Sequence, residues 1–299
     1  MDRLDALRAF VVAVDRGSLT AAAGVLQRSL PSVSRAIGSI EERVGARLLQ
    51  RTTRSLKLTE AGERYLLVVR RVLAELEEAD QGEGAVVEPQ GLLTVTAPLA
   101  FGALHVRPVV DAFLAKWAAV RTRLVLLDRV VSVVEEGVDV AVRIAHLPDS
   151  SLVATGLGCV RRVVVASPAY LERHGRPRRP ADLAAHRCIA STAVTPSDTW
   201  TFGARREGER PKHVRVRPVS SVNVAEPAIH SALEGAGVAC ALSYQVKEHL
   251  AAGTLVRLLG AFEPPPVPVH LVYPAASART AKVRAFVELA APRLREALR

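Results

Sequence analysis

The sequence predicts an α/β protein with a small helical module at its N-terminus, one long connecting helix and a larger C-terminal region. Three observations support this fold class. Apolar residues recur at three- and four-residue spacing in the N-terminal module, and helical spacing continues with dense charge over residues 59–79. From residue 92 onward, apolar strands alternate with helices. A chain of 299 residues has room for two or three domains with ordinary hydrophobic cores.

The chain carries an excess of positive charge, with 40 Lys and Arg against 30 Asp and Glu, and a formal net charge of +10. This excess favours a polyanionic partner, either nucleic acid or an acidic membrane surface, and charge alone does not choose between them. Residues 28–57 contain seven basic and two acidic residues, so this short stretch holds half of the excess. We therefore expect a phosphate-binding surface there.

The cysteines and the apolar runs favour a cytoplasmic protein without a membrane partner. Cys159, Cys188 and Cys240 are far apart, with no Cys-x-x-Cys pair and no even set for a disulfide framework. Charged residues interrupt the apolar pattern of the first ten residues, so neither a signal peptide nor a transmembrane span is predicted there. Later apolar runs are broken well before the roughly 18 residues that a span needs.

Local signals define the first two helices of the N-terminal module. The first carries apolar residues from Leu4 to Val14 at helical spacing and is expected to end near Gly17. Ser18 is suited to cap a short second helix over residues 19–26.

A third helix is expected after a tight turn, with Ser29 as its cap, Pro31 in its first turn and Gly45 at its end. Its inward positions are spaced four, three and four residues apart: Val33, Ile37, Ile40 and Val44. The outward face then presents Ser32, Ser34, Arg35 and Ser39. Hydroxyls and an arginine near a helix N-terminus can contact phosphates and base edges, so these helices match the helix-turn-helix plan.

A short hairpin is expected next, with strands at residues 47–50 and 55–58 around Arg51, Thr52, Thr53 and Arg54. Such a wing can reach the flanking DNA backbone or the minor groove. Taken singly, each arginine is as easily explained as ordinary solvated surface. The agreement of helix, turn, helix, hairpin and charge favours a DNA-binding array.

Residues 18–62 resemble the winged helix-turn-helix of the LysR-type transcriptional regulators. The resemblance rests on the alanines of the second helix, on Ser-x-Pro-x-Val-Ser-Arg at the start of the third, and on Arg-Thr-Thr-Arg and Leu-Thr-Glu-Ala-Gly downstream. One departure is Leu30, which stands where many members carry a Gln, so an amide contact to adenine is missing. The resemblance implies binding to double-stranded DNA, and we expect the contacts from Ser18, Thr20, Ser29, Pro31, Ser32, Ser34, Arg35, Arg51, Thr53 and Arg54.

The connecting helix carries one apolar stripe on an otherwise charged surface. The stripe comprises Tyr65, Val69, Val72 or Leu73, Leu76 and Ala79. A single exposed helix would bury this stripe most simply against a second copy of itself, which predicts a homodimer or a homotetramer, as the resemblance also implies. The alternative is packing against the C-terminal lobes of the same chain. Residues 81–91, with three Gly and one Pro, are predicted to be a linker.

The C-terminal region is expected to form two lobes. The first contains strands at residues 92–97, 123–128 and 138–144, with helices at 102–117 and 130–137. The second starts near residue 162 and ends at the three prolines 264–266. The segment 268–274 then returns a strand to the first lobe, and a final helix runs to Leu298. This pattern, with motifs such as Val-Thr-Ala-Pro and Ala-Ser-Pro-Ala-Tyr-Leu, resembles the two-lobed, periplasmic-binding-protein-like (type 2) effector domain of LysR-type regulators.

The resulting division is residues 1–58 for the DNA-binding domain, 59–90 for the linker and dimerisation helix with its hinge, and 91–299 for the effector-binding domain. Lobe I comprises about 91–161 and 267–299, and lobe II about 162–266.

Ligands of open α/β sheets sit outside the carboxyl ends of strands. That rule places a small-molecule effector against Thr96, Ala97, Pro98, Leu99, Phe101, Arg143 and Asn223. Thr96 and a helix N-terminus suit an anion, and the neighbouring apolar side chains suit an aromatic or short-chain carboxylate. The alternatives are that Pro98 and Leu99 shape a turn and that Arg143 is an internal ion-pair partner.

Other function classes explain less of the sequence. The chain lacks the Gly-x-Ser-x-Gly, His-Glu-x-x-His, P-loop and Rossmann signatures, so no enzyme, metal or cofactor is predicted. Lone Cys240 is more simply a small core residue than a redox switch. The open alternatives are a solute-binding protein, which would explain residues 92–299, and a DNA-binding protein whose effector cleft is vestigial.

Overall fold

The computed structural model describes residues 2–51, 56–80, 88–129, 132–133, 136–148, 151–203 and 211–299. The chain divides into two compact units, residues 1–88 with 132–138, and residues 89–131 with 139–299. Within the described residues, no helix is long and apolar enough to cross a membrane.

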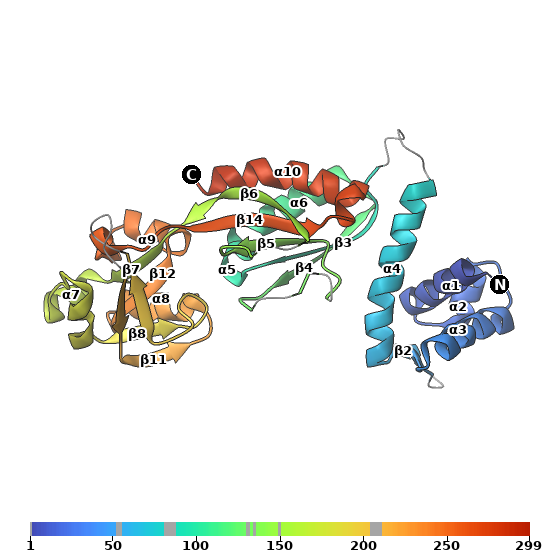
Figure 1. The fold of residues 1–299 in the computed structure, drawn as a ribbon, viewed down its shortest axis with the longest axis horizontal. Coiled ribbons are helices and arrows are strands. Elements are labelled where there is room, and N and C mark those ends of the chain that lie inside the picture. Colours follow the sequence, from blue (N-terminus) through green and yellow to red (C-terminus); the bar gives the residue numbers. More distant parts are fainter. Residues whose placement is uncertain are drawn as a thin grey trace. The chain divides into compact units, whose positions relative to one another are not determined.

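In the described part of the N-terminal unit, three short helices are followed by a two-stranded wing and one long helix, an order that Figure 1 lets the reader follow. Its elements are α1 (Arg3–Arg16), α2 (Leu19–Val25), α3 (Leu30–Val44), β1 (Leu49–Arg51), β2 (Leu56–Leu58) and α4 (Glu60–Asp80). The hydroxyls of Ser18 and Ser29 accept backbone N–H bonds at the starts of α2 and α3, and Gly17 and Gly45 end α1 and α3 in the left-handed conformation. The predicted helix limits are therefore confirmed to within a residue or two.

Two contacts hold the wing against the helices. The buried carboxylate of Glu41 accepts the backbone N–H groups of Leu48 and Leu49, at 2.8 and 3.0 Å. Thr59 begins α4 by donating its hydroxyl to the Arg47 carbonyl at 2.7 Å and accepting the Gly62 N–H at 2.9 Å. These bonds explain the Thr-Glu-Ala-Gly motif, because they fix α4 directly against the first wing strand.

The stripe on α4 has a different partner from the one expected. Leu66, Val69 and Leu73 are buried in the core of the N-terminal unit, and Tyr65 lies 5.9 Å from Phe10 of α1 between ring centroids. Most of the predicted seam is therefore core of this chain, because α1 already covers it. Among the α4 side chains that the structure describes, Val68 and Leu76 are the large apolar ones that remain exposed.

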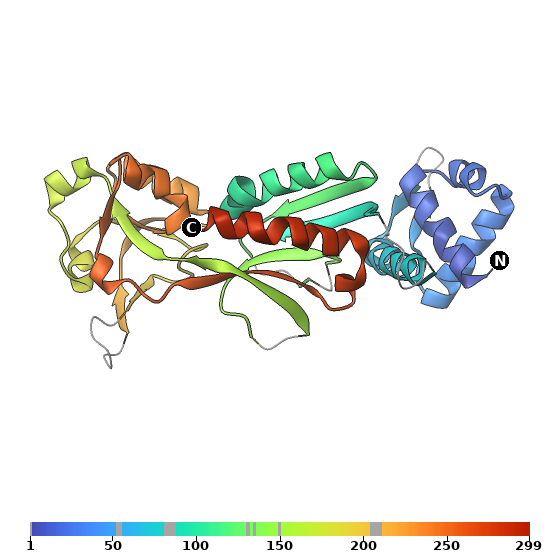
Figure 2. The same ribbon diagram turned by 90° about the horizontal axis from the view of Figure 1, so that it is seen from above.

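Lobe I of the second unit is a five-stranded mixed sheet in the order β4-β3-β5-β14-β6. Its elements are β3 (Gly91–Ala97), α5 (Leu99–Phe101), a π-helical turn (Gly102–Val106), α6 (Arg107–Lys116), β4 (Val120–Leu126), β5 (Val140–Ile144), β6 (Leu152–Val160), β14 (Val267–Pro274), a 3₁₀ turn (Ser277–Arg279) and α10 (Ala281–Ala297). Helices α6 and α10 lie side by side along the sheet (Figures 1 and 2). The returning strand at 268–274 is confirmed as β14, which pairs with β5 and β6.

Lobe II is a second five-stranded sheet, in the order β11-β8-β12-β7-β13, with a hairpin of β9 and β10. Its elements are β7 (Arg162–Ala166), α7 (Pro168–His174), β8 (Cys188–Ser191), β9 (Thr199–Phe202), β10 (Lys212–Arg215), β11 (Pro218–Val222), α8 (Ala225–Leu233), β12 (Val238–Leu242), α9 (Lys247–Ala251) and β13 (Val256–Leu258), with 3₁₀ turns at Pro180–Ala185, Ser243–Gln245 and Gly260–Phe262. The chain crosses between the lobes at Arg161 and again between β13 and β14.

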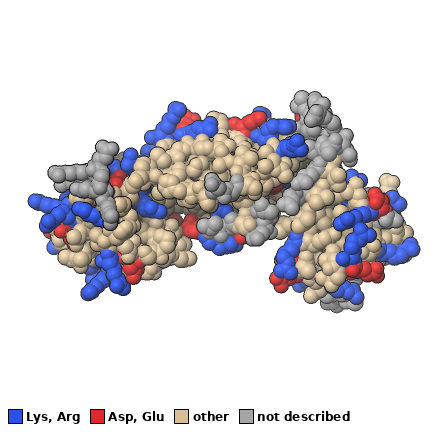
Figure 3. Space-filling view, viewed as in Figure 1, with Lys and Arg blue, Asp and Glu red and all other residues tan. Residues whose placement is uncertain are grey.

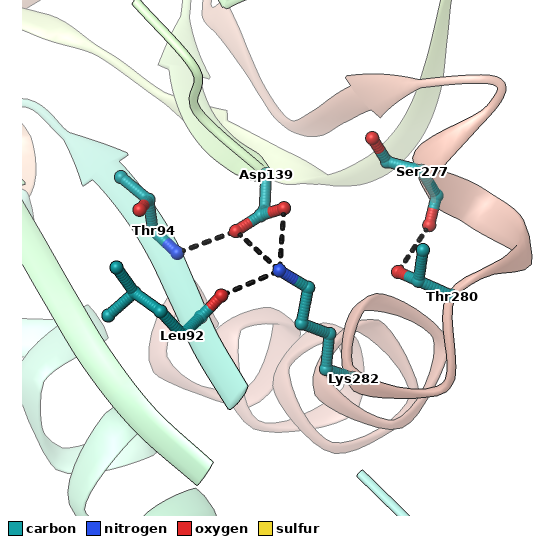
Figure 4. A network of polar contacts seen from close by, with 6 residues as sticks. All are labelled: Leu92, Thr94, Asp139, Ser277, Thr280 and Lys282. Atoms are coloured by element: carbon teal, nitrogen blue, oxygen red, sulfur yellow. Dashed lines mark hydrogen bonds and ion pairs between the residues drawn. The ribbon is translucent and has the colours of Figure 1, made fainter. Parts of the chain in front are cut away.

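A polar network around Lys282, the second residue of α10, links segments of lobe I that are far apart in the sequence (Figure 4). Its Nζ donates to the Leu92 carbonyl at 2.6 Å and lies 3.1 and 3.2 Å from the two Asp139 carboxylate oxygens. Asp139 also accepts the Thr94 N–H at 2.7 Å. The C-terminal helix is thereby fixed to the first strand of the lobe.

Some elements were not anticipated, namely β6, β11, β13 and α9. The helix expected at 130–137 and the linker expected at 81–91 lie partly outside the described residues.

Candidate nucleic-acid interface and effector pocket

The outer face of α3 carries the side chains expected to meet DNA. Pro31 and Arg35 are exposed, Ser32 and Ser34 are half-buried, and the Arg35 Nε donates to the Pro31 carbonyl at 3.4 Å. Ser29 is exposed, and its hydroxyl caps the helix.

Two hollows flank this face. One, of about 350 Å³, is lined in part by Arg3 and Arg43, and the other, of about 650 Å³, by Arg47. Arg35 and Ser39 line both, so they form a ridge between the hollows. Among the described lining residues, the first hollow has three arginines and no carboxylate, whereas in the second Arg35 and Arg47 are balanced by Glu41 and Glu42. Arginines stand on both sides of this ridge, Arg3 and Arg43 on one side and Arg47 on the other, where they could reach the phosphates that flank a DNA groove. Arg3, Arg43 and Arg47 were not among the expected contacts, although the last two belong to the basic stretch seen in the sequence.

The remaining expected DNA contacts lie around this face. Ser18 caps α2 by accepting the Ala21 N–H, and Thr20 is exposed on the same helix. Arg51 ends β1 and pairs with Leu56, whereas Thr53 and Arg54 lie outside the described residues.

Lysine and arginine are not confined to this domain. The face in Figure 3 carries them on the N-terminal unit and on both lobes. Net charge alone would therefore not locate the DNA-binding surface; the α3 geometry is needed as well.

A pocket of about 150 Å³ lies between the two lobes. Lobe I supplies Thr96, Ala97 and Pro98 from the end of β3, and Arg143 from within β5 rather than from the turn after it. Further lining residues were not expected: Asp128, Arg129, Arg162, Tyr244 and Gln245. Asp128 and Arg129 come two and three residues after the end of β4, so the strand-end rule that selected Thr96 would also have found them.

Three expected effector contacts do not line this pocket. Leu99 begins α5, and its backbone N–H donates to Asp128 at 2.9 Å. Phe101 is fully buried in the core of lobe I, with its ring 5.3 Å from that of Tyr244. Asn223 is exposed just before α8. All three follow a strand end in the sequence, but none of them lines the pocket, and the Phe101 side chain is buried in the core of lobe I.

Thr96 is buried, and its hydroxyl donates to the Val125 carbonyl at 2.9 Å. The hydroxyl proton is therefore committed within the sheet, and only the oxygen lone pairs remain for a ligand donor. The strongest donors around the pocket are instead guanidinium groups. Among the described lining residues, the guanidinium groups of Arg129, Arg143 and Arg162 outnumber the one carboxylate, Asp128, so this part of the lining has an excess of positive charge.

Tyr244 joins the lobes at the pocket. It belongs to the turn after β12 of lobe II, but its ring packs against Phe101 and lies 5.7 Å from the ring of His105, both in lobe I. Burial raises the pKa of the Tyr244 phenol and lowers that of His105, so both side chains are neutral near pH 7.

A helix-turn-helix with a basic recognition face, followed by a two-lobed α/β domain with a pocket between its lobes, defines a ligand-responsive DNA-binding regulator. The chain belongs to the LysR family of transcriptional regulators. Residues 4–63 match the family described as bacterial regulatory helix-turn-helix protein, lysR family, and residues 87–295 match the LysR substrate binding domain.

Relatives of known name agree with this assignment. The transcriptional regulator PtxR of Pseudomonas aeruginosa is 35% identical over 95% of this chain and 91% of its own length. The regulator CrgA of Neisseria meningitidis is 33% identical over 94% of each chain. The solved structure of CrgA, a LysR-type transcriptional regulator, covers 97% of this chain and 98% of its own with a TM-score of 0.61 at 30% identity. The family consists of transcriptional regulators rather than enzymes.

Proposed function

We propose that this regulator binds its operator through the α3 ridge and the wing and responds to a small anionic effector held between the lobes. The proposal assigns residues 1–58 to DNA binding, 59–90 to dimerisation and the hinge, and 91–299 to the effector. Lobe I is about 91–161 with 267–299, and lobe II is about 162–266. The place of action would be the cytoplasm, where the DNA is.

The DNA contacts proposed for direct readout are Ser34 and Arg35, because they stand at the exposed start of α3. Ser18, Thr20, Ser29, Pro31 and Ser32 would contact the flanking backbone, and Arg51, Thr53 and Arg54 would do so from the wing. A two-fold dimer would present two such faces to one duplex.

The effector proposal rests on one observation: of the residues that the structure describes, three guanidinium groups and one carboxylate line the pocket between the lobes. A small carboxylate fits this charge, and the volume of about 150 Å³ favours a compact one. Thr96, Ala97, Pro98 and Arg143 would contact it from lobe I. Arg162 and Gln245 would contact it from lobe II, so the ligand would favour the arrangement in which both lobes reach it.

A thermal-shift screen of short mono- and dicarboxylates tests this effector proposal. A true effector should raise the melting temperature of the wild type in a saturable way. Arg143→Gln should weaken its binding about tenfold or more, because a charge-assisted contact is lost, whereas Arg121→Gln, on the exposed edge strand β4, should not. Equal binding to wild type and Arg143→Gln would place the ligand elsewhere.

A further inference from the structure

Lobe II contains a second cavity, distinct from the effector pocket. Its volume is about 300 Å³, twice that of the pocket between the lobes. It lies between β9 and the sheet strands β7, β12 and β13, which contribute Trp200, Val164, Cys240 and Leu258. Only Arg162 and Val194 line both cavities.

The inner wall of this cavity is apolar. Val164, Trp200, Phe202, Leu258 and Leu259 each expose less than a tenth of their surface. The polar lining includes the hydroxyls of Ser197, Thr199 and Thr201 at the exposed edge. Arg162, Thr195 and Glu263 are further polar residues of the lining. An apolar wall with a few polar groups is the usual composition of a small-molecule site.

The described residues that line the cavity include one charged side chain of each sign, Arg162 and Glu263, so the lining has no excess of positive charge that would select an anionic ligand. The Glu263 side chain is almost fully buried and forms a bidentate ion pair with Arg257, so its charge is already matched. A ligand carboxylate entering this cavity would lie near that carboxylate. It would also lose part of its hydration on the apolar wall, and Arg162, the cation among the described lining residues, is shared with the effector pocket.

Two features of the cavity wall indicate a ligand-binding site. The Trp200 indole N–H is buried and has no acceptor among the described residues, an uncommon situation for a buried donor. Leu259 has a φ of +54°, a left-handed backbone conformation that bulky residues rarely adopt and that tends to occur where ligands are held.

We propose that this lobe II cavity is a second ligand site, for a neutral single-ring compound that carries one hydrogen-bond acceptor. A dry cavity of about 150 Å³ can hold benzene, so twice that volume admits a ring with a short substituent. The ring would lie on the apolar wall, and a small shift of the Trp200 side chain would bring its N–H to the acceptor. This proposal does not depend on the effector proposed for the pocket between the lobes.

Trp200 itself supplies the measurement, because the chain has only one other tryptophan, Trp117 in lobe I. In the full-length Trp117→Phe variant, indole emission reports on Trp200 alone. Acetophenone is the probe, since it is a neutral single-ring ketone. We expect titration with acetophenone to change the emission in a saturable way. The apparent affinity for benzoate, its anionic analogue, should be at least about tenfold weaker.

Filling variants locate the binding. In the Trp117→Phe background, Cys240→Phe fills the inner wall, and Thr201→Phe narrows the exposed edge, where misfolding is not a concern. Each should weaken acetophenone binding about tenfold or more, while Val219→Phe, on the exposed strand β11 of the same lobe, should leave it within about twofold. Non-saturable quenching would overturn the proposal. Binding that survives Thr201→Phe but is lost in Arg143→Gln would also overturn it, because the probe would then occupy the effector pocket.

Discussion

Lys282 and Asp139 form an ion pair inside lobe I, with the ammonium 3.1 Å from one carboxylate oxygen and 3.2 Å from the other (Figure 4). The two side chains come from α10 and from the start of β5, 143 residues apart in the sequence. Both are mostly buried, with 16% and 20% of their side-chain surface exposed. The same ammonium satisfies the Leu92 carbonyl, so one cation connects three segments of the lobe.

Lys282→Met should destabilise lobe I by about 1–3 kcal/mol. The substitution leaves the Asp139 carboxylate without its cation and the Leu92 carbonyl without its donor, although the Thr94 N–H still serves Asp139. Thermal and urea unfolding of the full chain measure the loss. Lys247→Met, on the exposed face of α9, is the matched control and should change stability by less than about 0.5 kcal/mol. Equal stability of the two variants would contradict this role.

Gly62→Ala should disrupt the junction between the wing and α4. A Cβ at this position would lie 2.0 Å from the Leu48 carbonyl oxygen, and backbone atoms cannot move aside easily. We expect a loss of about 1–3 kcal/mol or more in the unfolding of the N-terminal domain, measured by calorimetry. Gly24→Ala, where a Cβ meets nothing within 4 Å, should instead stabilise the domain by about 0.5–1 kcal/mol. A Gly62→Ala variant as stable as the wild type would contradict the close packing of Gly62 against the Leu48 carbonyl.

The double variant Val68→Glu/Leu76→Glu should convert the proposed dimer into monomers. These side chains are 47% and 38% exposed on α4, and like charges would meet across a two-fold seam. Sedimentation velocity at micromolar concentration gives the oligomeric state. Val25→Glu, on an equally exposed valine of α2, should leave it unchanged. A dimer that survives the double variant would exclude this face of α4 as the seam.

The three cysteines should differ sharply in reactivity. Burial raises the pKa of the Cys240 thiol to about 12 and that of Cys188 to about 11, so both stay protonated at pH 8. For Cys240, the shift from 9.0 lowers the reactive thiolate fraction about a thousandfold. Iodoacetamide followed by peptide mass mapping should therefore modify exposed Cys159 first. Rapid modification of Cys240 in the folded protein would contradict its burial.

Elements with local signals could be predicted from the sequence. Ser18, Ser29, Gly17 and Gly45 act within one turn of their own helix, so α1 to α3 were placed almost to the residue. The strand after the three prolines was also found, because Pro264–Pro266 end the second lobe visibly.

Elements that depend on distant partners were harder to predict. Strand β6 contains Gly156 and Gly158 and shows no clean alternation, and it is formed by pairing along the whole of β14. The α4 stripe looked like an interface because the sequence does not show that α1 packs against α4 and that Val69 belongs to the core of the N-terminal unit.

The effector pocket shows the same limit. The strand-end rule brought Thr96, Ala97 and Pro98 to the correct edge of the sheet, but it could not tell that Phe101 points into the core. Nor could it find Arg162 or Tyr244, because these reach the pocket from the second lobe and only the folded arrangement of the lobes brings them there.

The most direct test of the central claim is a binding titration with labelled duplex from the region upstream of the regulator's own gene, compared with a shuffled duplex, at several salt concentrations. The wild type should prefer the upstream duplex, and its affinity should fall steeply with salt. Ser34→Ala and Arg35→Ala should lose the preference for the upstream duplex. Arg51→Ala and Arg54→Ala should weaken binding to both duplexes alike and flatten the salt dependence. Arg293→Ala, on the exposed face of α10, is the control and should change neither. An unaltered preference and affinity in the Ser34, Arg35 and Arg54 variants would contradict the α3 ridge and wing as the DNA-binding surface.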